Sequence, residues 1–153
     1  VCSIGIHFPK RNLHPILDVC RVLDVKKASN NVAELTAIQE ALKIYSKEDI
    51  KIPLNIYSDS KYSMNCITKW YPSWKKKGIV ETKKNYELIS NIVNLYQNIS
   101  KKTKVNFRYI EAHTGKNDED SIGNSIADKL ASQALKEYSN KFEQFNTLNF
   151  KTN

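Results

Sequence analysis

Three carboxylates occupy settings in which they could bind a divalent cation together. Glu34 lies where a strongly periodic apolar segment begins, Asp59 ends the strand-like run L-N-I-Y-S-D-S, and Asp128 lies in S-I-G-N-S-I-A-D-K-L-A. None of the three is specific alone, because acids near the start of a helix are common for stability. Carboxylates far apart in sequence usually meet only to bind metal, since bare like charges repel. The three together favour a cluster for hard divalent cations.

Alternating strand-like and helix-like segments would position these acids. Apolar periodicity predicts strands at 2–8, 17–25, 54–58 and 105–110, and helices at 32–45, 60–69, 86–98 and 122–138. Asn30 or Asn31 would cap the first helix. The order predicts an α/β fold in which a mixed sheet is flanked by helices, with Asp59 at the C-terminal end of a central strand. Glu34 and Asp128 would lie near helix N-termini, where the macrodipole favours negative charge.

Length and composition predict one domain with its own core. The chain has 153 residues, of which 41% are hydrophobic and 10% aromatic. We expect the domain to cover 1–138 and a C-terminal tail to cover 139–153, where periodicity is lost. Three cysteines without a C-x-x-C pair indicate neither a zinc site nor a disulfide framework. No apolar run approaches ~18 residues, so we expect no membrane partner, an intracellular location and a monomer.

A lysine-rich segment lies beside aromatic residues and accounts for part of the formal net charge of +8. The lysines Lys75, Lys76, Lys77, Lys83 and Lys84 follow closely after Trp70, Tyr71 and Trp74. One interpretation is a solvated loop beside two core tryptophans. The other is an electropositive arm that follows phosphates with an aromatic face against sugar or base. If about five phosphates are neutralised, log affinity should fall with log salt at a slope of roughly −4 to −5.

Several motifs, in order from about residue 1 to 135, resemble those of type 1 ribonuclease H, the endonuclease that cuts RNA paired to DNA. N-N-V-A-E-L at 30–35 is similar to the family's T-N-N-x-A-E-L, and Y-S-D-S at 57–60 to its Y-T-D-S. Residues 67–70 and 74–78 resemble the family's basic protrusion. E-A-H-T-G at 111–115, followed by G-N at 123–124 and A-D-K-L-A at 127–131, is similar to its x-x-H-x-G…G-N-x-x-A-D-x-L-A block.

One departure concerns the first strand. The family begins with a strand carrying a fourth carboxylate in a segment like T-D-G-S, whereas residues 1–8 resemble its second strand, and no acid precedes Asp18. Either the chain is a fragment, which the missing initiator Met favours, or this member has lost its leading catalytic residue. Without that carboxylate the remaining site should hold metal poorly, at a cost on the order of 10³-fold or more in rate.

The resemblance implies hydrolysis of the RNA strand of an RNA/DNA hybrid by two Mg²⁺ ions, for which Mn²⁺ can substitute. Asp59 would bridge the ions, Glu34 would bind the second, and Asp128 the one that activates water. His113 would handle a proton or assist product release; a lone histidine is otherwise a hydrogen-bonded surface residue. The segment after His113 is about five residues longer than in well-known members, and its acids Asp118, Glu119 and Asp120 are interpreted as a solvated loop.

Substrate contacts are expected from short polar and aromatic residues. Asn30, with Ser29 beside it, would read the 2′-hydroxyl of the RNA, and a helix-capping role for Asn30 is equally compatible. Tyr62 and Trp70 would face the DNA strand, or lie in the core. The full predicted nucleic-acid-binding set is Ser29, Asn30, Tyr62, Trp70, Trp74, Lys75, Lys76, Lys77 and Asn85.

Two other functional classes stay open. One is a hybrid- or duplex-binding module that has lost catalysis. The other is a related nuclease-fold enzyme, either a transposase-like core or the ribonuclease H domain of a reverse transcriptase or polyprotein. The lysine–tryptophan segment argues against a transposase, and the A-E-L and A-D-K-L-A blocks favour the ribonuclease.

Overall fold

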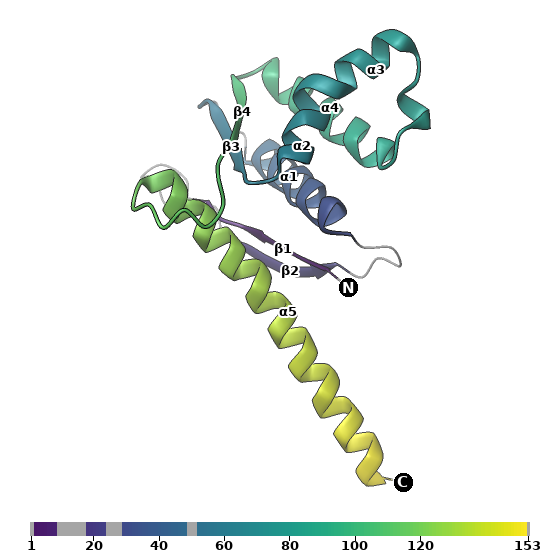
Figure 1. Cartoon of the computed structure of the whole chain (residues 1–153), viewed down its shortest axis with the longest axis vertical. Helices are drawn as coiled ribbons and strands as arrows, with labels where there is room; N and C mark the ends of the chain where they lie inside the picture. Colours follow the sequence, from purple (N-terminus) through teal and green to yellow (C-terminus); the bar gives the residue numbers. More distant parts are fainter. Residues whose placement is uncertain (1, 9–17, 24–28, 49–51, 153) are drawn as a thin grey trace.

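The computed structural model describes residues 2–8, 18–23, 29–48 and 52–152, with side chains described as far as residue 140. The mixed α/β architecture predicted from the sequence is confirmed (Figure 1). The segment between the first two predicted strands, residues 9–17, lies outside the described residues. In chain order the elements are β1 (Cys2–Ile6), β2 (Val19–Leu23), α1 (Asn30–Lys47), β3 (Leu54–Ser58), α2 (Lys61–Asn65), the π-helical turn η1 (Cys66–Trp70), α3 (Tyr71–Lys77), the 3₁₀ turn η2 (Val80–Thr82), α4 (Tyr86–Ser100), β4 (Val105–Tyr109) and α5 (Glu119–Thr152).

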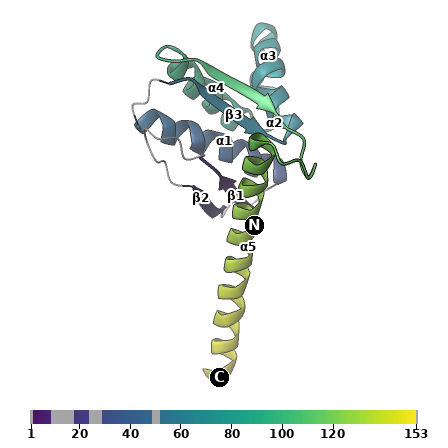
Figure 2. The same ribbon diagram turned by 90° about the vertical axis from the view of Figure 1, so that its left-hand side faces the viewer.

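The described strands form two separate two-stranded sheets. β1 pairs antiparallel with β2, with Cys2 opposite Leu23, and β3 pairs in parallel with β4, with Leu54 opposite Val105. Both views place β1 and β3 as the inner strands of the two pairs, with α1 passing alongside (Figures 1 and 2). Among the described strands, β1 and β3 each hydrogen-bond to one neighbour. The edges that face each other across the middle of the molecule therefore carry backbone groups without a strand partner.

The alternation of side chains along β1 explains how its pair is held between two helices. Cys2 and Ile4 are buried against Ala33 of α1. On the opposite face of the strand, the Ser3 hydroxyl donates to the Ala131 carbonyl of α5 at 2.6 Å. Gly5 lies on this second face, and a Cβ there would overlap the Ala127 carbonyl oxygen of α5. A residue without a side chain is therefore required for β1 to approach α5.

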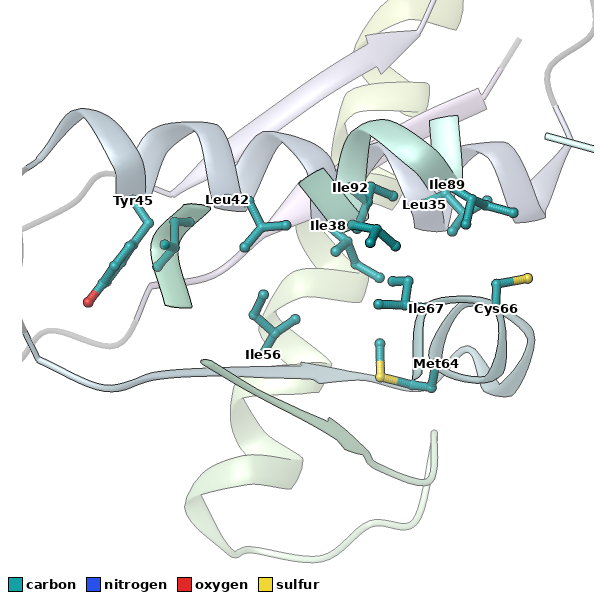
Figure 3. Close-up of a cluster of buried hydrophobic side chains, with 12 residues drawn as sticks. Leu35, Ile38, Leu42, Tyr45, Ile56, Met64, Cys66, Ile67, Ile89 and Ile92 are labelled. Carbon is teal, nitrogen blue, oxygen red and sulfur yellow. The ribbon is translucent and has the colours of Figure 1, made fainter. Parts of the chain in front are cut away.

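The larger core lies between α1, α4, β3 and the α2–η1 segment (Figure 3). Leu35, Ile38 and Leu42 line one face of α1 at the predicted spacing of three and four residues. They meet the fully buried Ile89 and Ile92 of α4. This packing fixes α1 relative to β3, and so sets the distance between the acids that the two elements carry.

Two predicted helix boundaries were wrong. The cap of α1 is Ser29, whose hydroxyl accepts from the Val32 amide at 3.2 Å, rather than Asn30 or Asn31. α5 begins at Glu119 and continues through Thr152 instead of ending at Tyr138, and its C-terminal half extends away from the other elements (Figure 1). The division into a domain at 1–138 and a tail at 139–153 stays a prediction. In the part of the chain that the structure describes, no helix is both long and apolar enough to cross a bilayer.

Candidate active site

The three carboxylates singled out in the sequence come from three different elements and interact electrostatically. Glu34 lies in the second turn of α1, Asp59 follows the last residue of β3, and Asp128 lies within α5. Burial raises the pKa of Glu34 to about 7, and the charges of Asp59 and then Asp128 add to the effect. Glu34 thus responds to both other acids, which is the behaviour expected of a carboxylate cluster.

Asp128 is also destabilised in its charged form. Burial raises the pKa of its carboxyl group, the charge of Asp59 raises it further, and His113 opposes both. The expected help from helix dipoles was wrong. Asp128 is the tenth residue of α5, and α1 has no acid in its first turn, so neither Glu34 nor Asp128 lies where the free N–H groups are. Their charges are held in place by the fold at an electrostatic cost.

Asp59 lies on a short bend that is fixed by serine side chains. The Ser60 amide donates to the Ser58 hydroxyl at 3.1 Å, and the Ser60 hydroxyl caps α2 by accepting from the Ser63 amide at 3.1 Å. Ser58 and Ser63 are buried. The run S-D-S therefore ends β3 and starts α2 within two residues, and this holds the Asp59 backbone in one position.

Asn124 contacts the cluster although it was not among the predicted site residues. Its Nδ2 donates to Asp59 Oδ2 at 3.2 Å, and so it orients one oxygen of that carboxylate. It lies about one turn before Asp128 on α5, in the G-N pair quoted above for the family resemblance. That spacing was the signal that could have identified it.

His113 lies in the segment between β4 and α5 with φ of 55°, a left-handed conformation uncommon for a residue with a side chain. Its Nε2 is 4.0 Å from Asp128 Oδ2, and its side chain is 85% exposed. A histidine that is exposed and beside a carboxylate can exchange protons with solvent and with a substrate.

The acidic segment after His113 is only partly a loop. Glu119 and Asp120 form the first turn of α5, and Asp118 accepts from both the amide and the hydroxyl of Ser121 at 2.9 Å. These bonds lower the pKa of Asp118 and make it the helix cap. The loop interpretation was wrong for Glu119 and Asp120, and the three acids are all exposed.

The chemistry of the cluster fits a hard divalent cation, because its donors are carboxylate oxygens whose mutual repulsion a cation would relieve. Glu34, Asp59 and Asp128 would hold it. Their positions are not closed around a single point: among the described residues, no three His, Cys, Asp or Glu side chains are arranged to hold a metal ion. The described part of β1 contributes no acid to the gap between the two sheets.

The second group of predicted residues forms a continuous aromatic–lysine surface, which we define as Tyr62, Trp70, Trp74, Lys83 and Asn85 together with Lys75, Lys76 and Lys77. The Tyr62 and Trp70 rings meet edge-on at 6.1 Å, and the Trp70 and Trp74 rings are 6.2 Å apart. Lys83 Nζ lies 5.5 Å from the centre of the Trp74 ring, and Asn85 Nδ2 donates to the Tyr62 hydroxyl at 3.2 Å.

The aromatic residues differ in exposure, and their contact with nucleic acid stays a prediction. Tyr62 and Trp74 pack against the larger core, whereas Trp70 is 39% exposed. The segment expected as a loop or arm is helical. Lys75, Lys76 and Lys77 form the exposed last turn of α3, which ends at Gly78 in a left-handed conformation with φ of 67°. The three lysines therefore place their positive charge at the C-terminal end of α3.

Ser29 and Asn30 lie at the start of α1, one turn before Glu34. The Ser29 hydroxyl oxygen is used in capping, and Asn30 is exposed in the first helical position. Because Asn30 does not cap the helix, its amide is available for another partner.

A protein-family model described as RNase H matches residues 3–136. The chain is 38% identical over 140 residues to a probable ribonuclease H of Acanthamoeba polyphaga mimivirus, covering 88% of this chain and 58% of that protein. It is 39% identical over 112 residues to ribonuclease HI of Streptomyces coelicolor, covering 71% and 44%. The chain thus spans about half the length of the relatives to which it is most readily compared.

Solved structures show the same fold. The RNase H domain of PFV superposes with a TM-score of 0.57 at 21% identity, over 86% of this chain and 78% of that domain. Prototype foamy virus protease-reverse transcriptase gives a TM-score of 0.59 at 25% identity, over 70% of this chain and 14% of that protein.

Proposed function

The chain belongs to the ribonuclease H family, and we propose that it hydrolyses the RNA strand of RNA/DNA hybrids. The observation that carries the proposal is the meeting of Glu34, Asp59 and Asp128 from α1, β3 and α5, in which Asp59 and Asp128 help raise the pKa of Glu34 to about 7. Relatives named ribonuclease H support a hydrolytic nuclease, and the family generally depends on divalent metal.

The chain's own residues have distinct tasks in this proposal. Two divalent ions, when bound, would activate the attacking water and stabilise the departing 3′-oxygen. Asp59 presents an oxygen oriented by Asn124. Glu34 gives up its proton when positive charge enters the cluster, because opposite charge favours the ionised carboxylate. His113, beside Asp128 and open to solvent, holds a proton for the departing 3′-oxygen.

Substrate positioning follows from the surfaces on either side of the cluster. Lys75, Lys76 and Lys77 bind backbone phosphates, and Trp70 offers an exposed ring to a sugar or base of the DNA strand. Asn30 lies one turn from Glu34 and is free of a capping role, so it can read the 2′-hydroxyl of the RNA.

The second candidate function is a hybrid-binding module with impaired catalysis. It is favoured by the division of the sheet, since the gap between β1 and β3 has the position in which a further strand would complete it and could supply a fourth carboxylate. The aromatic–lysine surface is complete without such a strand, so binding would persist while cutting fails.

Cleavage of a labelled RNA strand decides between the two. The chain is incubated with an RNA/DNA hybrid and Mg²⁺ or Mn²⁺, beside matched duplex DNA and duplex RNA. The proposal requires cutting of the hybrid alone, abolished by Asp59→Asn and retained in Asp120→Asn, a matched change at an exposed acid. Salt-sensitive hybrid binding without cutting would establish the second candidate instead. Equal cutting of all three duplexes would contradict both.

A further inference from the structure

A hollow of about 260 Å³ lies next to the carboxylate cluster, between the ends of β3 and β4 and the segment that leads into α5. Its lining includes Tyr57, Tyr109, Glu111, Thr114 and Asp120, and we call it the tyrosine hollow. No residue that we assign to metal or to the aromatic–lysine surface is part of its lining.

The two tyrosine rings are unusually open for residues at the ends of sheet strands. Tyr57 is 41% exposed and Tyr109 is 45% exposed. Tyr57 points away from the core, because its neighbours Ile56 and Ser58 are both buried and side chains alternate along a strand. Lys61 Nζ lies 5.3 Å from the centre of the Tyr109 ring. The β3–β4 register pairs Tyr109 with the buried Ser58, so Tyr109 lies on the opposite face of the sheet from Tyr57 and has Lys61 against its ring. The open ring of Tyr57 therefore suits a flat partner that stacks on it.

Three residues that line the hollow are close in sequence to residues of the candidate active site. Tyr57 precedes Asp59 by two residues, Thr114 follows His113 directly, and Ser121, also in the lining, lies one turn before Asn124 on α5. The lining of the hollow is therefore adjacent in sequence to Asp59, His113 and Asn124.

The charges of the hollow favour a base over a phosphate. Its charged lining residues are Glu111, Asp118, Asp120 and Lys116, so carboxylates outnumber ammonium groups by three to one. Carboxylates repel phosphate but accept hydrogen bonds from the amino and imino groups of a base edge. Guanine presents two such donors side by side on its Watson–Crick edge, so it fits this lining best.

Building on the proposed function, we propose that the tyrosine hollow takes one unpaired base of the RNA strand next to the cut, with guanine preferred. The base stacks on Tyr57, and its two donors face the carboxylate of Glu111. The site then favours hybrids whose RNA strand continues as a single strand beyond the paired region.

The test measures binding without divalent metal, so that it does not depend on cutting. Fluorescence anisotropy compares a blunt RNA/DNA hybrid with the same hybrid carrying a three-nucleotide guanine extension on either end of its RNA strand. We expect one extension to tighten binding by about tenfold, as stacking of a base on an aromatic ring typically does. An abasic extension of equal length should give no gain, because it keeps the phosphates and removes the base.

Variants separate the hollow from the rest of the surface. Tyr57→Ala should abolish the gain and leave affinity for the blunt hybrid unchanged, whereas Tyr57→Phe should keep the gain. Tyr138→Ala removes an equally exposed tyrosine on α5 and should have no effect. Circular dichroism checks that each variant is folded.

An equal gain from abasic and guanine extensions, or a gain that survives loss of the Tyr57 ring, would overturn the hollow as a base site. Failure to bind even the blunt hybrid would overturn the proposed function first. The two failures are therefore distinguishable in one titration series.

Discussion

The carboxylate cluster and the aromatic–lysine surface are built in opposite ways. The cluster joins Glu34, Asp59 and Asp128, which come from elements far apart in the chain, and the charge of Asp59 helps raise the pKa values of Glu34 and Asp128. The aromatic–lysine surface uses residues 62–85, joined by contacts between near neighbours such as Trp70 and Trp74. The first depends on long-range packing of α5, and the second depends on one local segment. Damage to α5 should therefore remove chemistry and spare binding.

The largest effect is expected at Asp128. Asp128→Asn removes a predicted metal ligand and should lower the cleavage rate by about 10³-fold or more. Thermal stability at pH 8 should not fall, because the variant also removes a charge that burial and Asp59 disfavour. Single-turnover cleavage and a melting curve measure the two effects. Asp120→Asn on the same helix is the matched control, and equal rate losses in both variants would exclude a specific role for Asp128.

Substitution of Gly5 tests how far the fold depends on the long-range packing of α5 against β1. A Cβ at Gly5 would overlap the Ala127 carbonyl and lie 2.7 Å from the Ala131 amide nitrogen. Gly5→Ala should therefore cost about 1 to 3 kcal/mol of unfolding free energy and move α5 away from β1. Intrinsic fluorescence should change little, because both tryptophans of the chain lie in the aromatic–lysine surface.

Gly123→Ala is the control for this change. Its Cβ would lie 3.6 Å from His7 Cδ2, an ordinary contact, and alanine favours the helix by up to about 1 kcal/mol. Denaturant titration should show Gly123→Ala equal to or above the parent. A Gly5→Ala protein as stable as the parent would show that β1 does not depend on close approach to α5.

Glu34 should make stability depend on pH. The pKa of Glu34 in the folded chain is about 7, above the ordinary 4.5. The contribution of Glu34 to the free energy of unfolding is therefore fully present below pH 4.5 and is lost as the pH rises through 7. Without divalent metal, Glu34→Gln should be more stable than the parent at pH 8 by about 2 to 3 kcal/mol. Below pH 4.5 the difference should vanish. Glu48→Gln, at the exposed end of α1, is the matched carboxylate control.

The smallest effect is expected at the lysines of α3. Replacing Lys75, Lys76 and Lys77 with alanine should make the slope of log affinity against log salt shallower by about 2 to 3. The rate of cutting at saturating hybrid should be unchanged, because these residues lie outside the cluster. Lys136→Ala on α5 removes one lysine that lies outside the aromatic–lysine surface, and it serves as the control. An unchanged slope would show that the hybrid does not cross α3.

The sequence predicted the elements whose periodicity is local. Leu35, Ile38 and Leu42 mark the buried face of α1 as expected, and β3 has the predicted bounds Leu54–Ser58. It did not predict that α5 would continue to Thr152, because the apolar spacing becomes irregular after Tyr138. A helical segment that extends away from the other elements does not need a regular apolar face, so its apolar periodicity is weak.

The assignment of the site residues stays a prediction, and the electrostatics of the site could not be predicted from motifs. Motif order proposed Glu34, Asp59, Asp128 and His113, which interact electrostatically in the fold. It did not reveal that Asp128 lies too far along α5 for the dipole to help, since that depends on where the helix starts. Asn124 was missed although it lies one turn before Asp128 in the G-N pair, because its contact with Asp59 depends on how α5 packs near the end of β3.

The most direct test of the central claim is carboxyl-carbon NMR of the chain during titration with Mn²⁺, which broadens resonances of groups close to it. We expect the carboxyl resonances of Glu34, Asp59 and Asp128 to broaden together at the lowest Mn²⁺ concentrations. In Asp59→Asn, the broadening of the Glu34 and Asp128 resonances should be weaker. Broadening of Asp118, Glu119 and Asp120 in their place would contradict it, because the cation would then bind the exposed acids at the start of α5.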